Sequence, residues 1–110
     1  MLSSFFYGEA SNFYHDLGNL QELDGKSIQE INNRLYRVEG YSKVIDSGVS
    51  TELLVPIANK MNTKISAISS NYNETGEINE ADQEIFNQMV QDSRKFSELI
   101  TEIYYQNNIH

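Results

Sequence analysis

The chain has no cysteine, no tryptophan and a single proline, and its basic residues are half as many as its acidic ones. The absence of cysteine excludes disulfides, thiol catalysis and Cys-ligated zinc or iron–sulfur sites. No stretch approaches the run of roughly 18 apolar residues that crosses a bilayer. We therefore expect a globular domain without a transmembrane segment of its own, while an anchor upstream of Met1 stays compatible with the sequence.

The shortage of basic residues also bears on partners. Eight Lys and Arg against sixteen Asp and Glu give a formal charge of −8. Nucleic-acid binding requires clustered basic residues that neutralise phosphates, and here they are scattered along the chain. The sequence thus predicts no nucleic-acid partner. The acidic charge is typical of a soluble small domain and also favours a basic protein partner, and both interpretations stay open.

Four stretches carry apolar residues three or four positions apart, which is the spacing of one face of an α-helix. The third is the most regular, with Leu54, Ile57, Met61, Ile65, Ile68 and Tyr72. The pattern predicts helices over about 2–23, 28–47, 51–72 and 80–105. Because the connections are short, neighbouring helices must be antiparallel. The expected fold is all-α, a single-domain, up-down-up-down four-helix bundle over residues 1–110.

Local signals predict where these helices begin and end. Ser27 and Glu30 form the pattern of a capping box at the start of the second helix. Gly25, just before it, suits the left-handed residue that ends the first helix. Asn79 is the expected N-cap of the fourth helix, with Asp82 at its third position.

Pro56 leaves two alternatives for the start of the third helix. If Ser50 is the N-cap, the proline lies in the second turn, removes one backbone hydrogen bond and kinks the helix. If the helix starts at Val55, the proline occupies the first turn, where no hydrogen bond is lost.

Residues 71–82 form the most specific local pattern. Oxygen-bearing side chains fall at positions 1, 3, 5, 7, 9 and 12 of this segment, and Gly76 falls at position 6, where the chain of an EF-hand loop turns sharply. The segment resembles the loop variant of dockerin modules, although Asn71 and Thr75 stand where carboxylates are usual. The resemblance implies calcium as a cofactor, with candidate ligands Asn71, Asn73, Thr75, Glu77, Asn79 and Asp82.

Aromatic residues are more numerous near the amino terminus than one helix face can bury. Phe6 and Phe13 fit the buried stripe of the first helix, so the neighbouring rings point elsewhere. Exposed tyrosines are typical of protein interfaces. The predicted partner-binding residues are Phe5, Tyr7, Tyr14, Tyr36 and Tyr41.

No catalytic motif accompanies these features, and the two histidines, His15 and His110, have no suitably spaced partner. We expect a non-enzymatic interaction module that binds another protein or a second copy of itself. Two roles fit: the extracytoplasmic part of a bacterial sensor or surface protein, and a small inhibitor- or immunity-type protein. The abundance of Asn, Ser and Tyr weakly favours a location at the cell surface. The alternative function is a calcium-binding helix-loop-helix protein.

Overall fold

The computed structural model describes residues 4–20, 23–49 and 53–108, and nearly all of them are helical. The helices are α1 (Ser4–Asn19), α2 (Gly25–Val49), α3 (Val55–Thr75) and α4 (Glu80–Asn108). No strand occurs in these three ranges. The predicted all-α class and the number of helices are confirmed.

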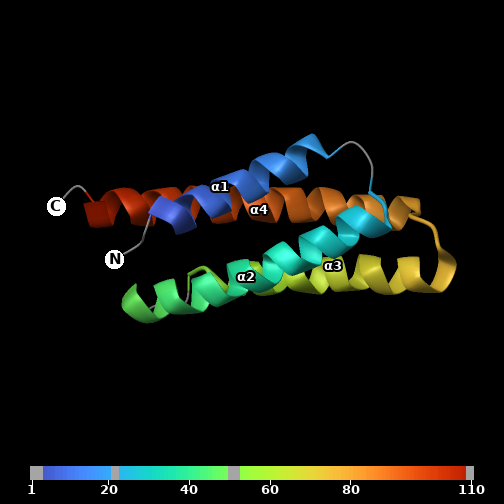
Figure 1. Ribbon diagram of the computed structural model, residues 1–110, viewed down its shortest axis with the longest axis horizontal. Coiled ribbons are helices and arrows are strands. Elements are labelled where there is room, and N and C mark those ends of the chain that lie inside the picture. The colour runs from blue at the N-terminus through green and yellow to red at the C-terminus, as the bar shows by residue number, and fades with distance from the viewer. Residues whose placement is uncertain (1–3, 21–22, 50–52, 109–110) are drawn as a thin grey trace.

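Successive helices run in opposite directions, and the start of α1 and the end of α4 lie at the same end of the molecule (Figure 1). The long axis measures 51 Å, against 24 and 19 Å across. α2 packs on α3, α3 on α4 and α1 on α4, whereas α1 meets α2 over only a few residues. The structure is the predicted antiparallel four-helix bundle.

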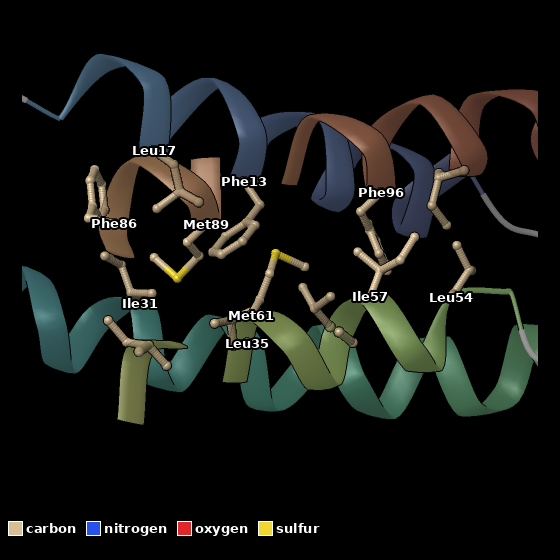
Figure 2. Close-up of a cluster of buried hydrophobic side chains, with 14 of the residues drawn as sticks. Phe13, Leu17, Ile31, Leu35, Leu54, Ile57, Met61, Phe86, Met89 and Phe96 are labelled. Atoms are coloured by element: carbon tan, nitrogen blue, oxygen red, sulfur yellow. The ribbon is translucent and has the colours of Figure 1, made fainter. Parts of the chain in front are cut away.

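One dry core runs along the bundle and takes residues from all four helices. Figure 2 shows Phe13 and Leu17 reaching inward from α1 and Met89 from α4, towards Met61 of α3. The α3 stripe is buried as predicted at five of its six positions, and Tyr72 is partly buried. Removal of these side chains from water is the main force that holds the helices together.

Two serines interrupt the buried stripes, and neither requires a partner on another helix. The Ser42 hydroxyl donates to the Val38 carbonyl at 2.7 Å, and the Ser93 hydroxyl donates to the Val90 carbonyl at 2.7 Å. Both hydroxyls are therefore satisfied within their own helix, so the core tolerates these polar residues without a buried network.

The start of α2 differs from the prediction. The N–H of Ser27 donates to Asp24 Oδ1 at 2.8 Å, and the N–H of Asp24 donates to Ser27 Oγ at 2.8 Å. Asp24 is thus the cap and Ser27 the third helical residue, so α2 begins three positions earlier than predicted. Gly25 is the first residue of α2 and not a left-handed terminator, and α1 ends at Asn19 instead of about residue 23. Asp and Ser are both good helix caps, and here the reciprocal Asp24–Ser27 pair forms instead of the predicted Ser27–Glu30 capping box.

α3 begins at Val55, so Pro56 lies in the first turn and the second alternative for this proline is confirmed. Leu53 and Leu54 are not helical, so the predicted start at residue 51 is wrong. The other candidate cap, Ser50, lies outside the described residues.

The junction between α3 and α4 follows the predicted signals more closely. α3 continues to Thr75 and ends at Gly76, whose φ of 72° is left-handed. The N–H of Asp82 donates to Asn79 Oδ1 at 2.8 Å, and Asp82 Oδ2 accepts from the Asn79 N–H at 3.1 Å. The predicted cap of α4 is confirmed, and α4 extends to Asn108.

Candidate interaction surface

The structure distributes the predicted partner-binding residues over several faces. Phe5 and Tyr7 belong to α1, and their side chains lie outside what the structure describes. Tyr14 is partly buried, and its ring centroid lies 5.4 Å from that of the exposed His15. One turn later, Gly18 lines a hollow between α1 and α4, so Tyr14 occupies the α4-facing flank of α1.

Tyr36 and Tyr41 lie on different flanks of α2. Arg34 and Arg37 point towards α1, and Tyr41, one turn after Arg37, shares their flank and is partly buried. Tyr36 is 80% exposed, the highest value among the large apolar side chains that the structure describes. The predicted tyrosines that the structure describes therefore do not form one patch, and among Tyr14, Tyr36 and Tyr41 only Tyr36 is exposed.

Between α1 and α2, charged side chains add ion pairs to the shared core. Arg34 Nη1 lies 2.7 Å from Asp16 Oδ2, and the guanidinium carbon of Arg34 lies 5.2 Å from the Phe13 ring centroid. Arg37 Nη2 lies 3.4 Å from Glu9 Oε1. These arginines hold α1 in place by charge and cation–π attraction, so their chemistry is structural.

Val44 lies two turns beyond Tyr36 on the outer face of α2 and is 64% exposed. Gly40 lies between them, and a Cβ atom added there would meet no other group within 4 Å. We call Tyr36, Gly40 and Val44 the α2 surface. Because residues four apart are stacked along a helix, two apolar side chains here flank a notch that reaches the helix backbone.

The charges that border the α2 surface have partners inside the chain. Arg37 pairs with Glu9 on α1, and Lys43 Nζ lies 3.9 Å from Glu39 Oε1. The border is therefore close to neutral, in a chain whose formal charge is −8. Such a surface repels a partner less than the acidic faces of the molecule do.

The candidate calcium ligands do not lie in one loop. Residues 71–75 are helical, and only 76–79 connect α3 to α4. Asp82 Oδ2 accepts from Asn71 Nδ2 at 2.5 Å as well as from the Asn79 N–H. Thr75 Oγ1 accepts from the Glu77 N–H at 3.2 Å, and Asn73 lies on α3 facing α2. The dockerin-like loop implied by the resemblance is therefore not formed, and calcium binding itself stays a prediction.

Two carboxylates are buried among the described residues, and both cap helices. Asp82 caps α4 as above, and Asp46 accepts from the Leu54 N–H at 3.0 Å and from the Val55 N–H at 2.9 Å. No local sequence signal reveals this role of Asp46, because Leu54 and Val55 follow it by eight and nine residues. Within the described ranges, no three His, Asp or Glu side chains are placed to hold a metal ion.

The α2 surface has one weak signal in the sequence. Val44 falls outside the stripe that Leu35, Val38 and Ile45 continue, so an apolar residue occupies a position that the helical period assigns to solvent. Its pairing with Tyr36 across Gly40 becomes visible only once the buried face of α2 is known.

Comparison with known proteins supplies no further guide to this surface. No protein-family model, curated protein or solved structure matches the chain. None of the helices, over the residues that the structure describes, has the length and apolar character to span a membrane.

Proposed function

We propose that the protein is a non-enzymatic interaction module whose α2 surface binds a second copy of the same chain. The observation that carries the proposal is the exposure of Tyr36 and Val44, at 80% and 64%, on either side of Gly40. Tyrosine is enriched at interfaces because its ring buries a large area and its hydroxyl stays hydrated. The use of both buried carboxylates as helix caps supports a binding role over acid–base catalysis.

The spacing of the α2 surface suits a symmetric pair. When two α2 helices cross in antiparallel fashion at Gly40, Tyr36 of each copy lies against Val44 of the other. Such a two-fold arrangement uses the same patch on both chains. The glycine allows the two backbones to approach closely, so both larger side chains are covered at once.

Gly40→Ala separates association from folding. The added methyl group meets open space within the chain, so the helix gains about 1 kcal/mol in folding free energy. In the pair, the same methyl group separates the two backbones, and we expect dimer affinity to fall about tenfold. Gly8→Ala is the matched control, because it also adds a methyl group in open space but lies on α1.

Sedimentation equilibrium from about 10 µM to about 1 mM is the measurement. We expect a monomer–dimer equilibrium that Tyr36→Ser weakens and that Tyr105→Ser, at a 53% exposed tyrosine of α4, leaves unchanged. A wild-type chain that stays monomeric at the highest concentration contradicts the proposal. So does a dimer that both tyrosine variants weaken equally.

A further inference from the structure

A second surface of α2, nearer its amino end, forms a groove with α3. Two hollows of about 240 and 330 Å³ adjoin there and share Asn32, Ser69 and Asn73. The larger volume is at the lower end of the range for small-molecule sites. α2 and α3 run side by side along this part of the bundle (Figure 1). The groove is thus an open channel along the seam between two helices.

No charged residue lines this groove, although 22% of the chain is charged. The lining residues are Gly25, Ile28, Gln29, Asn32, Ser66, Ser69, Ser70, Tyr72 and Asn73. A cation would find no carboxylate here, and an anion would find no basic group and a chain of net charge −8. The chemistry of the lining therefore favours a neutral ligand.

The amides and hydroxyls of the groove retain their hydrogen-bonding capacity. None of the hydrogen bonds or ion pairs found in the described part of the chain uses the side chains of Gln29, Asn32, Ser69 or Asn73. The contrast is with Asn62, which donates to Glu39 at 2.9 Å, and with Asn71, which donates to Asp82. Carboxamides and hydroxyls both donate and accept, as the hydroxyls of a saccharide do.

An aromatic ring completes the groove. Tyr72 is partly buried and lies close against Gly25, since a Cβ at position 25 would be 3.1 Å from Tyr72 Cε1 and 3.2 Å from its hydroxyl oxygen. The absence of a side chain at Gly25 is what lets the ring stay there. An aromatic ring beside neutral hydrogen-bonding groups suits a ligand with both C–H and O–H faces.

We infer that this groove binds a neutral saccharide, held by the side chains of Asn32, Ser69 and Asn73 and by the ring of Tyr72. The groove is shallow and open, so a dissociation constant on the order of 1 mM is expected. The groove shares no residue with the α2 surface, although Asn32 lies one turn before Tyr36, and it does not depend on the proposed self-association.

Nuclear magnetic resonance titration of the full chain with maltotriose, cellotriose and chitotriose tests this inference. We expect saturable shifts for at least one trisaccharide, concentrated at the side-chain amides of Gln29, Asn32 and Asn73. Asn32→Ala weakens binding about fivefold, because it removes one set of hydrogen bonds. Asn33→Ala is the matched control, since Asn33 is exposed and does not line the groove.

Gly25→Ala provides a second variant that does not weaken the helix. Its methyl group requires the Tyr72 ring, which is the movable end of a side chain, to shift by a few tenths of an ångström, so we expect trisaccharide binding to fall while thermal unfolding still shows a folded chain. The inference is overturned by the absence of shifts with all three trisaccharides, or by shifts that Asn33→Ala reduces as much as Asn32→Ala. Equal shifts with glycerol also overturn it, since they indicate hydration of the amides alone.

Discussion

α2 has two neighbours, and it is joined to them in different ways. On one side, α3 packs closely along it, Asn62 bridges to Glu39 at 2.9 Å, and buried Asp46 caps the first turn of α3. On the other side, α1 meets α2 at few points, and the ion pairs there are Arg34 with Asp16 and Arg37 with Glu9. Figure 1 shows the same contrast, with α2 beside α3 and α1 beside α4.

The two sides of α2 therefore contribute unequally to the stability of the bundle. Partly exposed ion pairs contribute between zero and about 1 kcal/mol each, whereas a buried acceptor that satisfies backbone amides contributes more when its loss leaves them unpaired. α2 and α3 therefore form the more stable hairpin of the bundle. α1 is the element expected to open first in local unfolding.

The largest expected effect compares a core residue of each region. Ile65 of α3 is fully buried and Leu17 of α1 nearly so. We expect Ile65→Ala to lower the free energy of unfolding by about 4 kcal/mol and Leu17→Ala by about 2 kcal/mol, because α1 makes few contacts with α2 and can resettle. Urea denaturation measures both, and equal losses would remove the distinction between the two regions.

Asp46→Ala tests the cap that joins α2 to α3. The variant leaves the buried N–H of Leu54 and the N–H of Val55 without an acceptor, and we expect a loss of about 3 kcal/mol. Asp46→Asn retains one oxygen acceptor, so it is the control and its loss should be smaller. If the alanine variant unfolds at the same urea concentration as the wild type, the carboxylate does not stabilise α3.

Salt should act more on α1 than on α3, because the ion pair of α3, Lys64 with Asp92 of α4, is mostly buried and is screened less. Added NaCl screens the pairs of Arg34 and Arg37, and the double variant Glu9→Gln with Asp16→Asn should cost about 0.5 kcal/mol at low salt. Hydrogen exchange of the α1 amides should accelerate in both cases. Arg94→Gln, which breaks an exposed pair with Glu98 on α4, is the control. If the hydrogen-exchange rates of the α1 amides do not change with salt concentration, apolar packing alone holds this helix.

The smallest expected effect concerns Asp24, which caps the start of α2. The N–H and hydroxyl of Ser27, with the N–H of Lys26, lower the pKa of Asp24 below its ordinary value of 3.8. Since the folded pKa is the lower one, this stabilisation is fully present above pH 3.8 and is lost as the pH falls through the folded pKa. Denaturation at a series of pH values should show Asp24→Asn less stable than the wild type near neutrality and equal to it in strong acid. A constant difference would contradict the shift.

Prediction of helix ends succeeded where the cap signals were unambiguous and erred where several were present. Asn79 caps α4 with Asp82 at the third position, as expected, whereas Asp24, Gly25 and Ser27 offered competing signals at α2. The twelve-residue pattern beginning at Asn71 shows the same limit. Its residue types suit a metal loop, but α3 continues through Thr75 and places Asn71, Asn73 and Thr75 around a helix.

The candidate surfaces were harder to predict than the core. Tyr36 was expected to be exposed and is, but Tyr41, on the other flank, is partly buried. Gly40 and Val44 complete the α2 surface, and only the position of Val44 outside the buried stripe gives a weak signal in the sequence.

By itself, the sequence determined which face of each helix is buried, how many helices there are and that neighbours are antiparallel, because apolar spacing and short connections constrain these locally. Only the tertiary structure decided which flank of α2 meets α1 or α3, that Asp46 caps a helix other than its own, and that an uncharged groove follows the α2–α3 seam. Those features depend on how the helices are placed around the core. The spacing of apolar residues along a helix does not reveal them, because it is the same whichever helix lies on either side.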